Sequence, residues 1–192
     1  MSKAEALAPK DTIEEQAKQH FAKFFSKREN PIYPYLPRHV DQAEKWANII
    51  LADYPEADRR VVILAIWLHD IGWAIGEDSL DHAVKSEEET FRFLTDNGLS
   101  PETVSKVAHC VRAHRNRDIH PETLEAKIVA AADSASHFTD INYIVHVTDG
   151  IKDYALGKLE RDYKDIGLLP GLQEKLTPLY LAWKQLLSVF PD

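Results

Sequence analysis

The chain has 192 residues, of which 44% are hydrophobic and 28% charged, and its formal net charge is −8 at pH 7. This length fits one domain with a full hydrophobic core, and the composition is typical of a soluble globular protein. The acidic balance, without a basic cluster that could follow a phosphate backbone, argues against a nucleic acid polymer as partner. It leaves room for a small anionic substrate, because the local charge of a pocket can oppose the net charge.

The sequence contains one cysteine, Cys110, so an internal disulfide is excluded and a reducing compartment is favoured. The first twelve residues lack the apolar segment of a secretory signal, and no apolar run reaches the length of a membrane span. We therefore expect a cytoplasmic protein that does not bind membranes. A homodimer is compatible with the sequence, although no feature in it sets an oligomeric state.

The first part of the chain, residues 1–36, is expected to form one helix and a proline-rich turn. Apolar residues at helical spacing predict the helix over 13–25. The prolines of segment 30–37 prevent a continuous helix, so this segment is interpreted as an ordered turn. Pro37 then begins a second helix, which places His39 in its first turn, beside the buried edge.

An unbroken apolar run, Val61–Leu68, ends in the adjacent pair His69 and Asp70, and Gly72 follows. A helix that is apolar on every face belongs inside a core, so both polar side chains lie where an unpaired charge is costly. We interpret them as two ligands of one cation, with Gly72 as the helix stop that leaves them at the rim of a cavity. The alternative is a helix-end histidine beside a carboxylate, which is the commoner origin of a lone His-Asp dipeptide.

A further helix is predicted from about Asp81 to Asp96. His82 and Lys85 lie in its first turn and a half, where free N–H groups and the helix dipole favour an anion. A solvated charged first turn is an equally good interpretation. The inward-facing residues of this helix are expected to be Phe91, Phe93 and Leu94.

Two more helices carry candidate polar residues. The helix that begins at Ser100 has an apolar stripe that His114 continues, so His114 and the adjacent Arg115 are expected to face the interior or a cleft. The helix predicted over 121–138 carries Asp133 among alanines and valines, away from its main apolar stripe. Such an aspartate is better explained as a buried carboxylate with a cationic partner than as a surface residue.

The remainder of the chain is also expected to be helical, at about 141–147, 150–165 and 172–190. Nothing in these helices suggests chemistry, and both His146 and the charged run 158–162 are interpreted as structural or solvated. His137 is a candidate to support Asp133 from one turn away. No alternating strand pattern persists anywhere, so the predicted fold class is all-α.

In chain order, His39, His69 with Asp70, and Asp133 form the signature of the HD superfamily of metal-dependent phosphohydrolases. From Arg38 to Phe138 the chain resembles this family, especially its small bacterial hydrolases. The resemblance implies a single all-α helical bundle with the metal site in its core and extra helices at both ends. Its parts are expected to be an N-terminal helix and Pro-rich turn (1–36), the HD core (37–140) and C-terminal helices (141–192).

By this resemblance, His39, His69, Asp70 and Asp133 would bind one divalent cation. Two imidazoles and two carboxylates suit Mn²⁺, Fe²⁺, Ni²⁺ or Co²⁺, with Mg²⁺ as a further option. A bound cation lowers the pKa of its water and polarises the phosphoryl oxygen that it touches. Asp70 would also orient that water.

The resemblance also suggests catalytic and substrate-binding residues. His82 and His114 are assigned to catalysis, and Lys85 and Arg115 to substrate binding, as groups that hold phosphate or protonate the leaving oxygen. Some HD proteins bind a second metal through additional histidines, and His82 and His114 occupy comparable regions. The adjacent double histidine of the cyclic-dinucleotide branch is absent, since Arg115 follows His114, and we favour one metal.

The leading functional hypothesis is a metal-dependent phosphohydrolase that acts on a small phosphorylated metabolite, a nucleotide or other phosphomonoester, through a metal-activated water. One alternative is a di-iron oxygenase of the HD fold, which needs the second metal site. The other is a non-catalytic nucleotide-binding or signalling module. Such modules usually lose ligands, whereas all four ligands are present here.

Overall fold

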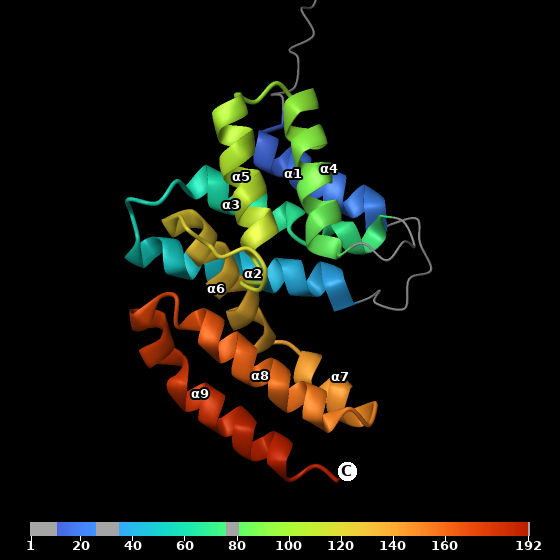
Figure 1. Ribbon diagram of the computed structural model, residues 1–192, viewed down its shortest axis with the longest axis vertical. Coiled ribbons are helices and arrows are strands. Elements are labelled where there is room, and N and C mark those ends of the chain that lie inside the picture. The colour runs from blue at the N-terminus through green and yellow to red at the C-terminus, as the bar shows by residue number, and fades with distance from the viewer. Residues whose placement is uncertain (1–10, 26–34, 76–80, 192) are drawn as a thin grey trace, which may run out of the picture.

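We describe residues 11–25, 35–75 and 81–191 of a computed structural model of the chain. Within these ranges the structure is all-α, as predicted, and contains no strand (Figure 1). None of the helices in the described part is long and apolar enough to cross a membrane. The elements are α1 (Ile13–Phe25), α2 (Tyr35–Asp53), α3 (Arg59–Leu68), η1 (Ile71–Ala74, a 3-10 helix), α4 (His82–Asp96), α5 (Pro101–Ala113), α6 (Leu124–His137), α7 (Asn142–Thr148), α8 (Lys152–Ile166) and α9 (Pro170–Ser188).

The helices form two groups that meet at α2 and α6. Figure 1 shows α1, α3, α4 and α5 in the upper part of the molecule and α7, α8 and α9 in the lower part. Helix α2 packs on α3 and α6, and α6 packs in turn on α5 and α8. Because α6 contacts both groups, a side chain on it can reach the space between them.

Helix α3 is the centre of the upper group. Every residue from Val61 to Leu68 is buried, and α1, α2, α5 and α6 all pack on this helix. Asp58 caps its N-terminus, where the carboxylate accepts hydrogen bonds from the N–H groups of Arg60 and Val61. Each large apolar side chain buried here contributes about 1.5–3 kcal/mol relative to exposure. The predicted buried helix is therefore confirmed.

Gly72 does not end this helix, contrary to the sequence interpretation. Helix α3 already ends at Leu68, and Gly72 lies in η1, where its N–H donates to Ser86 Oγ at 2.9 Å. A Cβ added at Gly72 would overlap the carbonyl oxygen of His82 and lie 2.8 Å from Ser86 Oγ. Glycine is therefore required so that η1 can pack directly against the first turn of α4.

Smaller details of the predicted helices also change. Phe91 is 42% exposed, so its predicted place in the core is wrong, whereas Phe93 and Leu94 are buried as expected. Phe91 falls one residue off the buried stripe of α4.

Helix α2 begins at Tyr35 rather than at Pro37, and most of the predicted Pro-rich turn lies outside the described residues. The single cysteine of the chain, at position 110, is fully buried in α5.

Candidate metal centre

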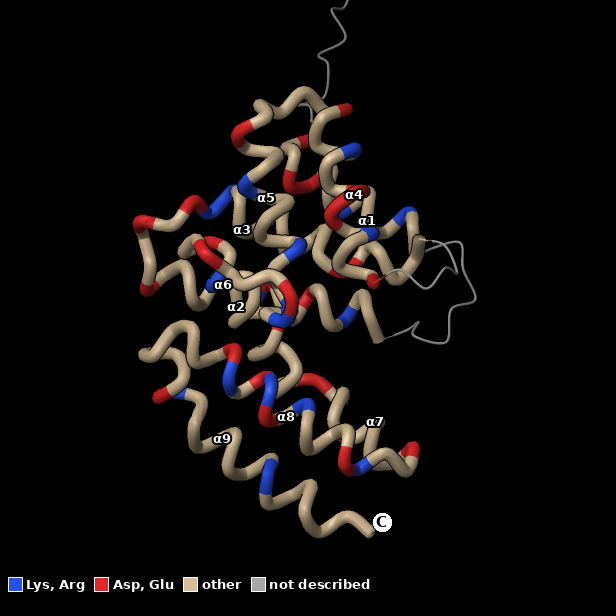
Figure 2. Tube along the Cα trace, viewed as in Figure 1, with Lys and Arg blue, Asp and Glu red and all other residues tan. Residues whose placement is uncertain are grey.

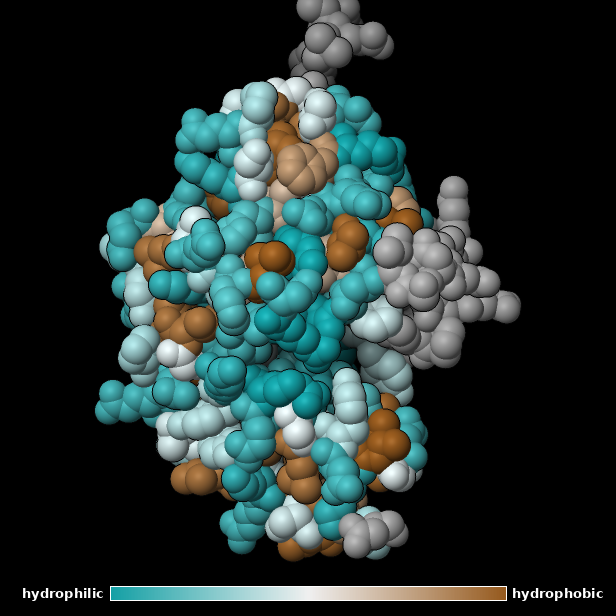
Figure 3. Space-filling model, in the orientation of Figure 1, coloured by the Kyte–Doolittle hydropathy of each residue, from teal (hydrophilic) through white to brown (hydrophobic). Residues whose placement is uncertain are grey.

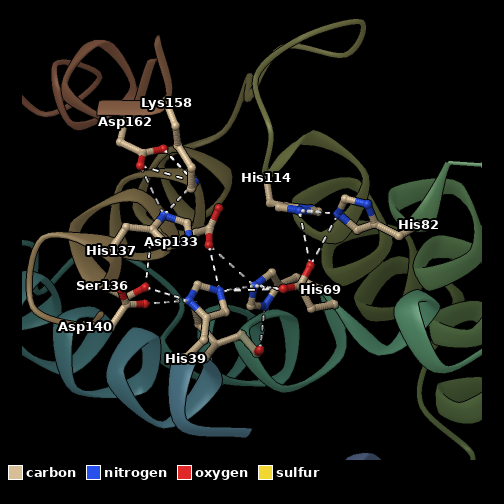
Figure 4. Close-up of polar contacts among 12 residues, drawn as sticks. His39, His69, His82, His114, Asp133, Ser136, His137, Asp140, Lys158 and Asp162 are labelled. Atoms are coloured by element: carbon tan, nitrogen blue, oxygen red, sulfur yellow. Dashed lines mark hydrogen bonds and ion pairs between the residues drawn. The ribbon is translucent and has the colours of Figure 1, made fainter. Parts of the chain in front are cut away.

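All four predicted metal ligands converge, and Figure 4 shows His39, His69 and Asp133 close together. His39 comes from the start of α2, His69 and Asp70 follow α3, and Asp133 comes from α6. His39 Nε2 lies 3.0 Å from Asp133 Oδ1, 3.6 Å from Asp70 Oδ2 and 3.4 Å from His69 Nε2. His69 Nε2 lies 3.5 Å from Asp70 Oδ2 and 3.7 Å from Asp133 Oδ1. One small space is thus surrounded by two imidazole nitrogens and two carboxylate oxygens.

Hydrogen bonds on the far side of each ring orient these histidines. His69 Nδ1 donates to the carbonyl oxygen of Ile66 at 2.7 Å. His39 Nδ1 lies 2.9 Å from Ser136 Oγ, and that hydroxyl itself donates to the Asp133 carbonyl at 2.7 Å, so its oxygen accepts from His39. With the proton on Nδ1, each Nε2 presents a lone pair to the centre, which is the tautomer that a metal ligand needs.

A second group of donors adjoins the first. His82 Nε2 lies 3.3 Å from Asp70 Oδ1 and 3.4 Å from His114 Nε2. His114 Nδ1 donates to the Val111 carbonyl at 2.7 Å, which turns its Nε2 toward the same carboxylate. Asp70 therefore offers Oδ2 to the first group and Oδ1 to the second. The donor atoms of Asp70, His82 and His114 lie close enough together to hold a cation of their own.

The charges of the site fit a bound cation. Burial opposes the protonation of His39, but hydrogen bonds to Asp133 and Asp140 and the charges of Asp133 and Asp70 outweigh it and raise the pKa of His39 to about 10. Burial also opposes the ionisation of Asp70 and Asp133, yet the neighbouring histidines lower the pKa of both carboxyls. The site thus balances its buried carboxylates with a proton on histidine. A divalent cation would supply the same positive charge and release that proton.

His114 has the opposite electrostatic behaviour. Burial and the charge of His69 lower the pKa of His114 to about 3, so its ring is neutral at pH 7. A neutral imidazole with a free Nε2 suits a metal ligand. A ligand role for His114 is therefore compatible with its surroundings, beside the acid role predicted from the sequence.

A cavity of about 560 Å³ opens above both donor groups. Figure 3 shows hydrophilic side chains gathered around a hollow at mid-height of this face. Of the two predicted substrate-binding residues, Arg115 lines the cavity and is ion-paired with Asp81. Lys85 is buried one turn further along α4 than His82 and does not line the cavity, so its position gives no support to a substrate contact.

Helix α8 supplies residues that the sequence interpretation missed. Lys158 Nζ lies 3.1 Å from His137 Nδ1 and 3.2 Å from Asp162. The His137 ring stacks on His39 with 4.6 Å between ring centres, and the Tyr143 hydroxyl donates to Asp162 at 2.7 Å. His137 therefore supports the metal centre mainly through His39 and α8.

The spacing of residues on α8 contained a signal for this role. Tyr154, Lys158 and Asp162 recur every four residues, so they share one helix face, and all three border the cavities beside Asp133. The buried residues Ala155 and Leu159 lie on the adjacent face. A polar stripe on an amphipathic helix normally faces water, which is why the sequence favours a structural or solvated role for the run 158–162.

Comparison with known proteins gave one family. The model of the HD domain matches residues 38–136, just over half of the 192-residue chain. Neither the curated proteins nor the solved structures contain a match to this chain. The matched segment begins one residue before His39, includes Asp133, and ends before α7. The chain therefore belongs to the HD domain family of metal-dependent phosphohydrolases.

Proposed function

We propose that this protein is a metal-dependent phosphohydrolase whose substrate is a small phosphorylated metabolite, a nucleotide or other phosphomonoester. The observation that supports it best is the convergence of His39, His69, Asp70 and Asp133 at the floor of a cavity of about 560 Å³. Oxygen and nitrogen donors of this kind suit Mn²⁺, Fe²⁺, Ni²⁺ or Co²⁺ and leave positions for water and substrate.

The protein groups have distinct roles in this reaction. A divalent cation, when bound, would activate a water and polarise the phosphoryl oxygen. His39, His69, Asp70 and Asp133 would hold it, and Asp70 would also accept a hydrogen bond from the attacking water and orient it. Arg115 lines the cavity and would bind the phosphate charge. The ion pair with Asp81 holds Arg115 in place before substrate arrives.

The nucleotide option is supported by aromatic residues around the cavity. Tyr35, Trp73 and Tyr154 are 43%, 41% and 49% exposed, and all three line it. The Trp73 ring already stacks on His82, with 4.3 Å between ring centres. Flat exposed rings beside a phosphate-binding site suit a nucleobase, since base stacking on an aromatic side chain contributes about 1–3 kcal/mol.

The decisive experiment is a phosphate-release assay. Protein loaded in turn with Mn²⁺, Fe²⁺, Ni²⁺ and Co²⁺ is screened against nucleoside mono-, di- and triphosphates and sugar phosphates. We expect Asp70→Ala to lower turnover by roughly 1,000-fold, since it removes several kcal/mol of charge stabilisation, while the helical circular dichroism is retained. Asp96→Ala, at the exposed end of α4, is the control and should turn over substrate normally. Undiminished turnover in Asp70→Ala would contradict the proposal.

A di-iron oxygenase is the second candidate, because Asp70, His82 and His114 form an adjacent donor group. Repeating the screen without O₂ separates the two enzymes. Phosphate release that persists without O₂ supports hydrolysis, whereas turnover that needs both iron and O₂ supports the oxygenase. Nucleotide binding with no turnover under either condition would favour a binding or signalling module.

A further inference from the structure

A small side pocket continues the main cavity beside Asp133. Its volume is about 60 Å³, and it is lined from the loop after α5 by Arg115 and Arg117 and from α8 by Lys158 and Arg161. That volume is several times the roughly 10–15 Å³ that one water needs, which suits a single polar group. Basic residues along α8 are visible in Figure 2. The pocket therefore places cationic side chains next to a predicted metal ligand.

Two of these cations differ from the others in having no carboxylate partner. Arg115 pairs with Asp81, and Lys158 pairs with Asp162. Among the described residues, Arg117 and Arg161 form no ion pair, and both are exposed. Guanidinium groups bind phosphoryl oxygens through paired N–H donors, so two unpaired arginines at one pocket favour an anion there.

The acidic residues of the pocket already have partners of their own. Asp133 faces His39 and His69, and Asp162 is engaged by Lys158 and by the Tyr143 hydroxyl. Asp165, also in the lining, accepts a hydrogen bond from Asn116 at 2.8 Å. The described acidic residues of the pocket therefore do not neutralise the two arginines, whose positive charge is available to bind an anionic ligand.

Local structure holds both arginines at the pocket. Asn116 adopts the left-handed conformation, with φ of 46°, and its bond to Asp165 ties the loop that carries Arg117 to α8. Arg161 lies over the Tyr154 ring, with its guanidinium carbon 5.5 Å from the ring centre. Gly157 leaves room for it, since a Cβ there would lie 3.2 Å from Arg161 Nη1.

We propose that Arg117 and Arg161 form a second anion subsite, which binds a phosphoryl group adjacent to the one at the metal centre. The inference rests on the proposed function, which identifies the group bound at the metal centre as a phosphoryl group. It specifies the substrate class as compounds with two linked phosphoryl groups, such as nucleoside diphosphates or triphosphates, in preference to simple phosphomonoesters. Both arginines are then specificity residues that contact the substrate away from the reacting phosphorus.

The test compares two non-hydrolysable probes, methylphosphonate and methylenediphosphonate, by isothermal titration calorimetry. The parent and the double variant Arg117→Gln/Arg161→Gln are measured at the same fixed excess of Mn²⁺, so that chelation by the probe affects both equally. We expect the double variant to bind the diphosphonate about 10- to 100-fold more weakly, because charge-assisted hydrogen bonds are lost, and the monophosphonate within about twofold of the parent. Arg60→Gln, at the exposed start of α3, is the matched control and should change neither affinity.

The outcomes separate this inference from the proposed function. Equal losses for both probes in the double variant, or no loss for either, would overturn the subsite. If Arg60→Gln lost as much diphosphonate affinity as the double variant, the subsite would also be overturned, because the loss would then be a general effect of net charge. A protein that keeps the arginine-dependent preference but releases no phosphate contradicts the proposed function alone. A protein that releases phosphate without this preference contradicts the subsite alone.

Discussion

The HD core, α2–α6, and the C-terminal helices, α7–α9, contribute to the same cavity in different ways. The core supplies the histidines and aspartates of the metal centre, which are buried and oriented by backbone carbonyls such as those of Ile66 and Val111. Helix α8 supplies exposed or half-buried charges such as Lys158 and Arg161. Only the core falls within the family match.

Under the proposed function, the core would carry out the chemistry and the C-terminal helices would contribute to the choice of substrate. A metal ligand must be fixed in tautomer and direction, so its position is held by packing that tolerates little change. A side chain that binds an anion at the cavity wall acts through its charge and its length. Such a side chain can therefore lie at the surface. We therefore expect changes in the core to alter metal content, and changes in α7–α9 to alter stability or ligand preference while metal content is preserved.

The largest effect should come from single ligands of the two donor groups. His39→Ala removes a donor from the group formed with His69, Asp70 and Asp133. His114→Ala removes a donor from the group formed with Asp70 and His82. Asp70 remains in both variants and contributes an oxygen to each group. If both donor groups bind metal, elemental analysis should give near two equivalents in the parent and near one in each variant. Arg161→Gln, on α8, should leave the content unchanged. One equivalent in both the parent and His114→Ala would confirm the single-metal prediction made from the sequence.

The contact between η1 and α4 should be the next most sensitive. Gly72→Ala places a methyl group against the His82 carbonyl and Ser86 Oγ, so α4 must shift at a cost of about 3 kcal/mol. Urea denaturation of the metal-free protein measures this loss. Gly171→Ala in α9 meets no atom within 4 Å and should leave stability equal or slightly higher. Similar losses in both variants would mean that the close packing at Gly72 is unimportant.

In the C-terminal helices, the buried Asp162 provides a test of stability without a change in metal binding. Tyr143→Phe removes the hydroxyl that donates to this carboxylate at 2.7 Å. Hydrogen bonds to charged groups contribute about 1.5–3 kcal/mol, so we expect a loss of that size with metal content unchanged. Tyr163→Phe, which loses only a neutral bond to Thr177, should cost about 1 kcal/mol. A loss of metal in Tyr143→Phe would show that α7 and α8 help to hold the ligands.

The smallest expected effect concerns pH. Burial raises the pKa of Asp165 to about 6, above the ordinary carboxyl value, so protonation favours the folded state. The stabilisation of the folded state by this protonation is fully present below about pH 4 and is lost as the pH rises through about 6. In metal-free protein, Asp165→Asn should therefore be more stable than the parent above pH 6, by about 1–2 kcal/mol after allowance for solvent contact.

The control for this prediction is the same pair of proteins at pH 4. There the advantage of Asp165→Asn should vanish, because the parent carboxyl is then neutral, and the Asn116 hydrogen bond can form in both. Chemical denaturation at half-unit steps from pH 4 to pH 8 gives the difference curve. A constant difference across that range would assign the effect to packing and not to charge.

The sequence predicted the parts of the site that local patterns encode. The apolar run Val61–Leu68 identified the buried helix, and the order of His39, His69, Asp70 and Asp133 identified four residues that the fold brings close together. These features depend on short spacings and on helical periodicity, both of which can be read from a single chain.

Long-range packing decides what the sequence could not give. The shared use of Asp70 depends on how closely α4 approaches η1, and that distance is set by the absence of a side chain at Gly72. Lys85 is predicted to bind substrate because it lies in the first turn and a half of a helix, where an anion is favoured, but it is not among the residues that line the cavity. The spacing of polar residues on α8 shows that they share one face, but the placement of that face at the cavity depends on the long-range contact of α8 with α6.

The burial of Cys110 has a practical consequence for experiments on this protein. It is the sole cysteine of the chain, and burial raises the pKa of its thiol to about 12, so the native fold protects it from alkylation. Its labelling rate therefore reports how often the core around α5 opens. Since His114 lies one turn further along, metal loading should slow the labelling. A cysteine introduced at position 117 would react selectively and could carry a fluorophore to the cavity wall.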